Sequence, residues 1–504
     1  MATYSFINNG LSGCLITVEC SLSRGLPSIS IVGMATKAVD ESKERIRATI
    51  KNSNFNFPKG RIVINLAPAD LPKDTSSLDL AIAISILAAD SQIKHDISKF
   101  SFIGELGLEG QIRPVSGAIG KIISGLKETS GPIFLPSGNS KQAELVNTTG
   151  RIVCVSSLKE VVALLNDEAL LNSKINSKPV NRTPVTPSQT QKYIDFSEII
   201  GQESAKRALI IAASGGHNIL LSGPPGTGKS MLAKAFTGIL PPLSRLQTLE
   251  TTHIHSLAVS KNDQIISLPP LRTPHHSASD VSIMGGGHML RPGEISLAHN
   301  GVLFLDELPE FSRTAIESLR QPLEDRTITI ARAQRTATFP ARFILIATSN
   351  PCPCGYYNST HTCTCSAADI QRYQKKLSGP IMDRIDIFID VNEVEHKSLM
   401  NTNQQAVSDK YIDIVTKTRQ TQNNRQGIAL NSFLDDKNLK KLANLDKDAE
   451  QLLISAAQKM DLSARAYMRT IRVARTIADI DESQTINTEH IAEALQYRAK
   501  NTLL

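Results

Sequence analysis

The stretch Gly223-Pro224-Pro225-Gly226-Thr227-Gly228-Lys229-Ser230 carries the strongest pattern in the sequence. It follows an apolar run, Asn218 to Leu221, that predicts a buried strand, and it leads into a helical pattern that begins at Met231. A glycine-rich loop between a strand and a helix is typical of phosphate binding, because its backbone N–H groups and the helix dipole attract phosphate oxygens. These eight residues therefore predict a nucleotide site in which Lys229 contacts the β- and γ-phosphates and Ser230 binds Mg²⁺.

Two further strands end in polar residues that suit the same site. Val302 to Leu305 is followed by Asp306, which can hold the Mg²⁺ ion, and by Glu307, which can orient the attacking water. Arg342 to Ser349 is followed by Asn350, whose amide would lie beside the γ-phosphate if this strand runs between the other two. The alternatives are an acidic turn after a core strand and a turn residue before proline. Together the three motifs predict ATP hydrolysis, with ATP and Mg²⁺ as cofactors.

Arg384 stands among short acidic neighbours in the segment from Ser378 to Asp386. Such an arginine can be an ordinary ion-pair partner, or it can reach the γ-phosphate that a neighbouring subunit binds. The residues alone leave both interpretations open.

The order of these motifs resembles an AAA+ ATPase. A phosphate loop comes first, followed by the strand that ends in acidic residues, the strand that ends in asparagine, Arg384 and a helical region. Longer phrases resemble the magnesium-chelatase-like branch and, within it, the YifB/ComM family, over nearly the whole chain. These phrases are Arg291–Gly301, Leu308–Phe311 and Asn350–Gly355. Ile200, just before the first core helix, falls in a segment similar to the family's adenine pocket.

The resemblance implies a ring of identical subunits, a hexamer, in which Arg384 completes the neighbouring subunit's site. It also implies a catalytic arginine in the helical lid, which would be Arg465, with Arg469 as the second candidate. Arg465, Arg469 and Arg472 lie at positions i, i+4 and i+7, so a solvated basic helix face is the competing interpretation.

Composition divides the chain into three folded parts and a tether. Residues 1–166 alternate apolar strand-like runs with helical segments, which predicts a mixed α/β domain. Residues 167–193 are rich in Asn, Ser, Thr, Pro and Lys and predict a solvated linker. Strand and helix alternation in residues 194–396 predicts a doubly wound parallel sheet, and apolar residues at helical spacing in residues 397–504 predict a helical lid.

The N-terminal domain resembles the YifB type, which is similar in fold to the catalytic domain of Lon protease. That protease activates a serine with a lysine, so two positions decide whether its chemistry survives. Ser77 falls at the serine position, but Ile119 stands at the lysine position and cannot exchange a proton. Lys121 follows two residues later in what we interpret as a strand-like stretch, about 6 to 7 Å further along the same face. We therefore expect no proteolysis.

Four of the seven cysteines lie within fourteen residues, as Cys352, Cys354, Cys363 and Cys365. Two Cys-x-Cys pairs on either side of a polar loop can fold onto one tetrahedral ion, which favours structural Zn²⁺. Free thiols in a turn and a redox pair are the alternatives. His361 lies in the loop and could replace one cysteine as a ligand.

Two strand-like runs, Thr327 to Ala331 and Thr336 to Phe339, predict a hairpin with Arg332 and Arg335 near its tip. Its place before the Asn350 strand resembles a hairpin that related ring ATPases project into a central pore. Two arginines there suit sequence-independent phosphate contacts with DNA. A surface hairpin with solvated arginines is the alternative.

Bulk properties limit the remaining function classes. The 504 residues are 41% hydrophobic and 20% charged, which excludes a wholly disordered or fibrous chain. The longest apolar stretch, Leu80 to Ala89, is shorter than the roughly 20 residues of a membrane span, and Met1 to Gly10 has no basic region, so we expect a cytoplasmic protein without a membrane partner. A net charge of +7 permits a polyanionic partner without requiring one.

The resemblance suggests a helicase or translocase that acts on single-stranded or branched DNA, with branch migration during DNA uptake (natural transformation) or recombination as its role. A protein-remodelling ATPase shares every nucleotide motif and is the main alternative. A metal-chelatase motor, which would need partner subunits, is the third. Arginines near the hairpin tip favour DNA, because pores that thread protein usually carry an aromatic residue.

Overall fold

The computed structural model describes residues 2–33, 37–71, 73, 76–146, 150–176, 194–258, 264–287, 290–332, 335–359, 361–377, 379–393, 408–427 and 430–498. The chain divides into two compact units. The first takes in Met1–Ser188, Arg245–Ile266 and Ala331–Phe339, and the second takes in Gln189–Ser244, Ser267–Ile330 and Pro340–Leu504. Among the described helices, none combines the length and the apolar composition that a bilayer crossing requires.

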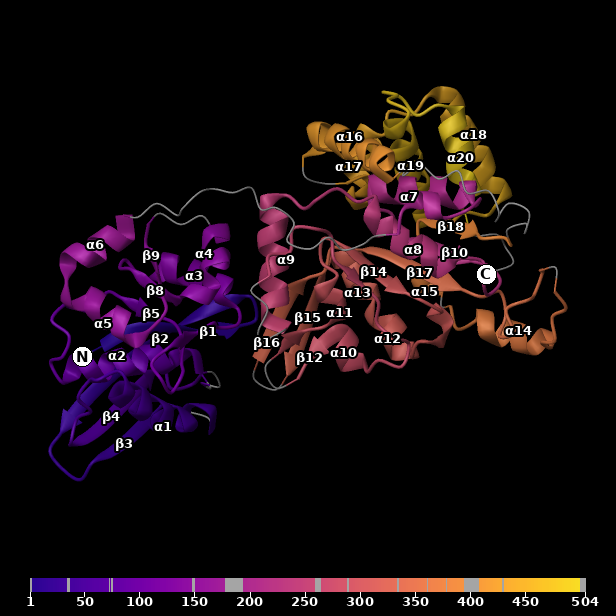
Figure 1. Cartoon of the computed structure of the whole chain (residues 1–504). Helices are drawn as coiled ribbons and strands as arrows, with labels where there is room; N and C mark the ends of the chain where they lie inside the picture. The colour runs from indigo at the N-terminus through magenta and orange to yellow at the C-terminus, as the bar shows by residue number, and fades with distance from the viewer. Residues whose placement is uncertain are drawn as a thin grey trace. The chain divides into compact units, whose positions relative to one another are not determined.

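The first unit is built on a mixed seven-stranded sheet with strand order β3-β4-β2-β1-β5-β8-β9 (Figure 1). Its strands are β1 (Ala2–Asn9), β2 (Ser12–Ser23), β3 (Ser28–Val32), β4 (Arg61–Ala67), β5 (Ser101–Phe102), β8 (Ile133–Pro136) and β9 (Ile152–Val155). Its helices are α1 (Lys37–Asn52), α2 (Asp79–Ala89), α3 (Ala118–Glu128), α4 (Ser140–Val146), α5 (Leu158–Asn166), α6 (Glu168–Asn176) and α9 (Arg245–Ala258). The apolar α2 is buried along almost its whole length, which explains why its sequence shows no polar face.

The structure corrects two sequence-based expectations in this unit. Residues 168–176, assigned to the linker, form α6, because Leu171 is buried in the core of the unit. The stretch interpreted as strand-like around Lys121 is α3, which begins after Gly117 in a left-handed conformation (φ +62°). In a helix, residues two apart point to different sides, so Lys121 does not share the direction of Ile119. The rest of the predicted linker, residues 177–193, lies outside the described residues.

The second unit contains a five-stranded parallel sheet with strand order β11-β14-β17-β10-β18, as an AAA-like core requires. Its strands are β10 (Ile219–Ser222), β11 (Leu271–Arg272), β14 (Val302–Leu305), β17 (Ile344–Ser349) and β18 (Ile387–Asp390). The three strands expected from sequence are therefore neighbours, and β17 lies between β14 and β10. Because all strands are parallel, the polar residues that follow them meet at one edge of the sheet.

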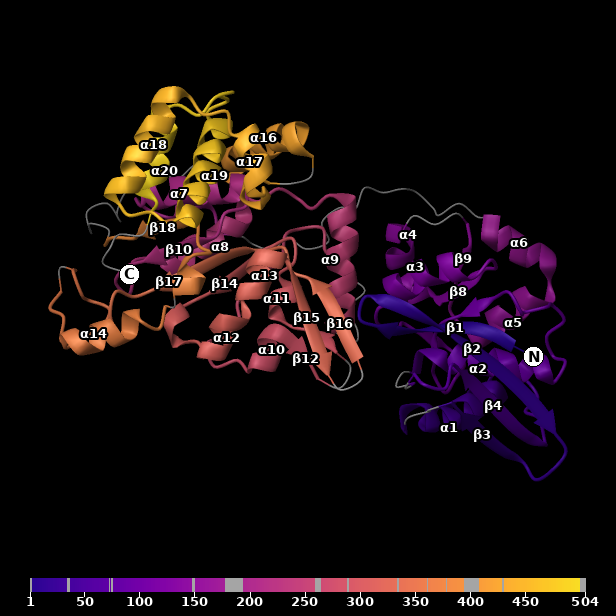
Figure 2. The ribbon, with the colours of Figure 1, turned by 180° about the vertical axis from the view of Figure 1, so that it is seen from behind.

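Short helices and strands surround this sheet, and a set of longer helices follows it. Around the sheet are α7 (Glu203–Gly215), α8 (Lys229–Gly238), α10 (Asp280–Met284), α11 (Glu294–Leu297), α12 (Arg313–Ser318), α13 (Arg320–Asp325), α14 (Ala367–Gln374) and α15 (Gly379–Met382), with the strands β12 (Gly285–Gly286) and β13 (Arg291–Pro292). The C-terminal helices, here called the lid, are α16 (Ser408–Gln426), α17 (Asp436–Leu442), α18 (Lys447–Lys459), α19 (Ala464–Ile480) and α20 (Thr488–Gln496). The lid packs on α7, at the β10–β18 side of the sheet (Figures 1 and 2).

A buried polar network holds the lid together and fastens it to the core. Asp479 accepts hydrogen bonds from Arg425 at 2.6 Å and from Arg475 at 3.1 Å. His217, at the start of β10, contacts Thr476 at 2.8 Å through one ring nitrogen and Asp386 at 3.3 Å through the other. Buried ionic groups are tolerated only when they are paired in this way, so the network specifies one position of the lid on the core.

Candidate nucleotide site and cysteine cluster

The phosphate loop connects β10 to α8, as predicted. Gly226 and Gly228 adopt left-handed backbone angles (φ +79° and +87°), which favour glycine. At Gly223 a side chain is excluded for a different reason, because a Cβ atom would lie 2.2 Å from the backbone oxygen of Val391. The glycines therefore allow the tight path of the loop, and Lys229 begins the helix.

Lys229 lies over this loop with its ammonium group among oxygen acceptors. Its Nζ donates to the carbonyl oxygens of Gly223 at 2.6 Å and Pro224 at 2.7 Å, and to Oδ1 of Asn350 at 3.2 Å. Burial lowers the pKa of Lys229, while the nearby carboxylates of Asp306 and Glu307 act in the opposite direction. The structure thus brings the predicted lysine and the predicted asparagine into direct contact.

The carboxylate of Asp306 joins the phosphate loop to the neighbouring strand. Its Oδ2 accepts a hydrogen bond from Ser230 Oγ at 2.8 Å, and its Oδ1 accepts one from Thr348 Oγ1 at 2.6 Å. Thr348 Oγ1 in turn accepts the backbone N–H of Glu307 at 2.8 Å. Ser230 and Asp306 are the hydroxyl and carboxylate that a Mg²⁺ ion at a nucleotide phosphate takes as ligands, and they fit such an ion here.

Arg384 lies away from this cluster. Its side chain is only 9% exposed, and its guanidinium is paired with Glu324 and bonded to the backbone oxygen of Pro380. Arg465, in the first turn of α19, is 67% exposed and lies 3.9 Å from the same Glu324 carboxylate. The structure therefore brings the two predicted catalytic arginines together around one carboxylate, apart from Lys229.

The other lid arginines are structural in this fold. Arg469 donates to the backbone oxygen of Ile385 at 2.8 Å, and Arg472 pairs with Asp436 at 2.6 Å. Since Arg469 is buried and bonded to the core, the expectation of a solvated basic face is wrong for these two residues. Arg465 is the one of the two candidates that remains exposed to a ligand.

Two predicted contact sites depend on loops. Ile200 is half-buried and lies just before α7, the position expected for an adenine contact.

The predicted hairpin is present as β15 (Thr327–Arg332) and β16 (Arg335–Pro340), which form a two-stranded sheet. The side chains of Arg332 and Arg335 lie outside what the structure describes.

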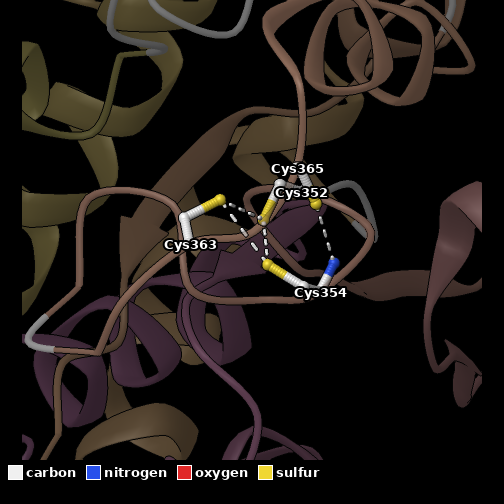
Figure 3. Close-up of side chains that lie close together, drawn as sticks. All are labelled: Cys352, Cys354, Cys363 and Cys365. Carbon is white, nitrogen blue, oxygen red and sulfur yellow. Dashed lines mark hydrogen bonds between the residues drawn. The ribbon is translucent and has the colours of Figure 1, made fainter.

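The four cysteines after Asn350 meet at one point (Figure 3). All four sulfur atoms lie within 4.8 Å of one another, and Cys352 Sγ is 3.3 Å from Cys354 Sγ and 3.7 Å from Cys363 Sγ. Four thiolates at the Zn–S distance of about 2.3 Å in a tetrahedron would have sulfurs about 3.8 Å apart. The fourth sulfur, of Cys365, accepts the backbone N–H of Cys354 at 3.4 Å. The cluster could therefore hold Zn²⁺.

His361 does not join the cysteine cluster. Its ring is 65% exposed and lies 3.8 Å from Glu393, with an edge contact to Tyr356. The expectation that it could replace a cysteine is wrong for this arrangement. Within the cluster, backbone N–H groups of Tyr356 and Thr364 lower the pKa of Cys354 to about 5, whereas burial and the neighbouring cysteines raise the pKa values of Cys363 and Cys365.

The serine that corresponds to the protease nucleophile is not accessible. Ser77 is 2% exposed, on a short 3-10 turn (Ser76–Leu78) that leads into α2. Beside it, Asp79 is buried and pairs with Arg45 at 2.9 Å. Ile119, at the position of the activating lysine, is fully buried.

Comparisons with known proteins cover nearly the whole chain. The sequence is 43% identical over 505 residues to the competence protein ComM of Haemophilus influenzae, covering 99% of this chain and 98% of that protein. It is 40% identical to the YifB protein of Escherichia coli, covering 98% and 96% of the two chains. The chain belongs to the YifB/ComM family.

Within this family the magnesium-chelatase relationship also extends along the sequence. Three family models match: "Subunit ChlI of Mg-chelatase" over residues 18–139, "Magnesium chelatase, subunit ChlI" over residues 195–399, and "Magnesium chelatase, subunit ChlI C-terminal" over residues 405–498. The magnesium-chelatase subunit ChlI of Chlorella vulgaris is 22% identical and covers 60% of this chain. The chain is thus a ChlI-like member of the AAA class, for which ATP and Mg²⁺ are the implied ligands.

Proposed function

We propose that this protein is an ATP-hydrolysing ring motor that acts on DNA. The observation that carries the proposal is the meeting of Lys229, Asp306 and Asn350 at the ends of three adjacent parallel strands. In this site the phosphate loop from Gly223 to Ser230 binds ATP, Ser230 and Asp306 hold Mg²⁺, and Glu307 orients the attacking water. Asn350 contacts the γ-phosphate through the amide that now faces Lys229.

The positions of two arginines support the proposal of a ring. Arg384 and Arg465 both lie around Glu324 and away from the phosphate loop, so they suit a nucleotide bound by another subunit. An arginine that enters a neighbour's site stabilises the charge of the transition state and makes hydrolysis depend on assembly. We therefore propose a homo-oligomer, a hexamer, with Arg384 as the trans-acting arginine and Arg465 beside it. Ile200 contacts the adenine.

DNA is the proposed substrate because a relative that matches over the full length is named a competence protein. Branch migration during DNA uptake is the role that this name favours, with Arg332 and Arg335 of the β15–β16 hairpin as phosphate contacts. The test is steady-state ATPase with and without single-stranded and branched DNA, across a salt series. We expect stimulation that fades with salt and is lost in the Arg332→Ala, Arg335→Ala double variant.

An ATPase rate that is indifferent to DNA would contradict the DNA proposal and leave ATP hydrolysis intact. It would favour protein remodelling, since that class shares the nucleotide site and differs only in what the ring grips. A matched control is Arg313→Ala, which removes a side chain that is 92% exposed on α12. The control variant should keep the stimulation by DNA.

We also propose that the cysteine cluster holds a structural Zn²⁺ ion. The support is the arrangement of the sulfur atoms. Four sulfurs that meet at one point fit a tetrahedral ion better than they fit a redox pair, which needs only two. Elemental analysis should find one zinc per chain in the parent protein and none after Cys363→Ser and Cys365→Ser. Cys14→Ser, outside the cluster, is the control, and a parent protein without metal would contradict the proposal.

For the N-terminal domain we propose a Lon-like fold without protease activity. Ser77 is buried, and Ile119 cannot activate it. Ser77→Ala should therefore leave ATPase unchanged, and ATP-dependent casein cleavage should be absent from both proteins. Cleavage by the parent that disappears in Ser77→Ala would overturn this assignment.

A further inference from the structure

A cavity of about 400 Å³ lies where the core of the second unit meets the lid. Its lining includes Pro322, Glu324, Arg326, Arg342 and Arg384 from the core, and Phe433, Arg465, Arg469 and Arg472 from the lid. The lining does not include the phosphate loop, but Arg384 and Arg465, which the proposed function assigns to a neighbouring subunit's nucleotide, both border the cavity.

The arginines of this cavity fall into two groups. Arg384 pairs with Glu324, and Arg465 lies 3.9 Å from the same carboxylate. Arg469 lies 3.6 Å from Asp383, and Arg472 pairs with Asp436. In the part of the chain that the structure describes, Arg326 and Arg342 have no carboxylate in ion-pair contact, although both line the same cavity. The described lining also holds five carboxylates, so the excess of positive charge is small and lies at the two arginines without an ion pair, Arg326 and Arg342. The five carboxylates belong to Glu324, Asp383, Asp386, Asp435 and Asp436.

Arg326 shows what this unbalanced charge does. Its guanidinium stacks on the ring of Phe433, 4.0 Å from the ring centre, so one face of the group is held by the lid. Burial lowers the pKa of Arg326 to about 10, and the charges of Arg342 and Arg472 act in the same direction. An anion between these residues would remove the repulsion and would replace the water lost by burial.

We propose that this cavity is a phosphate-binding site in which Arg326 and Arg342 neutralise a phosphate group. Guanidinium groups donate paired N–H bonds that match phosphate oxygens, and the stacked ring of Phe433 fixes the plane of one of them. Because Arg326 belongs to the core and rests on a lid residue, a bound phosphate stabilises the contact between core and lid. The phosphate is either free in solution or part of the nucleotide of an adjacent subunit, and the second source rests on the proposed function.

The first experiment measures binding without ATP hydrolysis. Thermal unfolding is followed against inorganic phosphate in Lys229→Ala protein, which weakens the phosphate loop as a competing site. We expect a saturable rise in the melting temperature, with the half-saturating phosphate concentration raised about tenfold by Arg342→Gln and further by Arg326→Gln, Arg342→Gln. Arg313→Gln is the matched control and should leave the titration unchanged.

The single variant Arg342→Gln keeps the test valid if Arg326→Gln unfolds the protein, because Arg342 is exposed. The proposal would be overturned if phosphate gave no saturable rise in the melting temperature of Lys229→Ala protein. It would also be overturned if adding Arg342→Gln to that protein left the phosphate titration unchanged. This result does not depend on ATPase activity, so it remains informative even if the proposed function fails.

The second experiment separates the two sources of phosphate. ATP binding and turnover are measured in Arg326→Gln, Arg342→Gln protein with Lys229 intact. Reduced turnover with unchanged nucleotide binding assigns the cavity to the nucleotide of an adjacent subunit. Unchanged turnover, together with lost stabilisation by inorganic phosphate, assigns it to free phosphate.

Discussion

At the scale of single residues, the hydroxyl of Thr348 is the part of the nucleotide site that no motif indicated. Motifs identified the groups that we propose contact phosphate, metal and water, and the structure brings Lys229, Asp306 and Asn350 together at the ends of three adjacent strands. Thr348 instead fixes two of those groups, since it donates to Asp306 and accepts from the backbone of Glu307. A threonine inside an apolar strand gives no signal in one sequence, because its partners are set by strand order.

Replacing Thr348 by valine should therefore loosen the metal site without changing the shape of the side chain. Asp306 loses a donor and Glu307 N–H loses its acceptor, each worth about 1 to 3 kcal/mol when buried. We expect the Mg²⁺ concentration for half-maximal ATPase to rise about tenfold. Thr348→Ser keeps the hydroxyl and should behave like the parent, whereas an unchanged Mg²⁺ dependence in Thr348→Val would refute the role.

Glu307 follows directly after Asp306, the proposed Mg²⁺ ligand, in a left-handed conformation (φ +54°) that non-glycine residues adopt at a cost. The strain is consistent with a side chain held in place for the reaction. Glu307→Gln should bind ATP normally and reduce turnover by about 100-fold or more, because the amide cannot accept the proton of water. Glu310→Gln, three residues along, should retain activity. Near-normal turnover in Glu307→Gln would end the assignment.

Residue patterns also failed in an instructive way at the lid. The spacing of Arg469 and Arg472 is the same for an exposed helix face and for a face packed on the core, so periodicity could not separate the two. Their partners, Ile385 and Asp436, come from other parts of the chain and are brought close only by the packing of α19. Long-range contacts of this kind are absent from local sequence patterns.

At the scale of elements, the cysteine loop is packed on the phosphate loop. Gly355, between the two cysteine pairs, has a left-handed backbone (φ +86°), and a Cβ atom there would lie 2.6 Å from Pro225 Cδ. The loop that could hold Zn²⁺ thus packs against the loop that we propose binds phosphate. Because the cysteine segment directly follows Asn350 in the chain, this contact places it beside the phosphate loop.

Gly355→Ala should displace the phosphate loop and raise the KM for ATP. A Cβ atom in a left-handed backbone costs about 1 to 2 kcal/mol, and the clash with Pro225 adds to it. The matched control is Gly427→Ala, because Gly427 has a similar φ of +79° but no atom within 4 Å of an added Cβ. Equal KM values in the two variants would show that the loops are not coupled.

Helices and strands were predicted correctly where apolar residues followed a clear strand or helix pattern. They were missed where polar residues, proline or glycine interrupted that pattern. The apolar strands β10, β14 and β17 were predicted from the sequence, but their order was not. The structure places β17 between β14 and β10, which is the condition under which Asn350 was expected to meet the γ-phosphate. Helix α3 was missed because Pro114 and two nearby glycines disfavour a helix in sequence-based prediction. The left-handed backbone of Gly117, which precedes the helix, cannot be recognised from the sequence alone. Helix α16 is largely polar, so its apolar stripe gives little signal until α7 packs against it.

At the scale of the whole molecule, chain order and compact units do not coincide. Sequence composition placed residues 194–396 in one domain, yet α9 and residues 331–339 group with the N-terminal unit. Within that unit, the backbone oxygen of Ser256 on α9 accepts the N–H of Gly117 at 3.2 Å. Composition could not predict this grouping, since α9 is an ordinary helix with both apolar and polar residues.

The assembly itself makes the strongest prediction, because the two halves of the proposed active site are separated within one chain. Lys229 lies on the phosphate loop, whereas Arg384 is held by Glu324 elsewhere in the same unit. Lys229→Ala and Arg384→Ala should each be inactive alone. Mixed in equal amounts in a ring, they should recover activity, since roughly a quarter of all sites then combine an intact Lys229 with a neighbour's intact Arg384.

The control for that mixing experiment is an equal mixture of two single variants, Glu307→Gln and Lys229→Ala. Both of these changes damage the subunit's own nucleotide site, so no arrangement of the ring rebuilds a complete one, and the mixture should stay inactive. Recovery with Arg384→Ala but not with Glu307→Gln requires that the arginine acts on another subunit. A Lys229→Ala and Arg384→Ala mixture no more active than its components would place Arg384 outside the reaction and return it to the ion pair with Glu324 as its whole role.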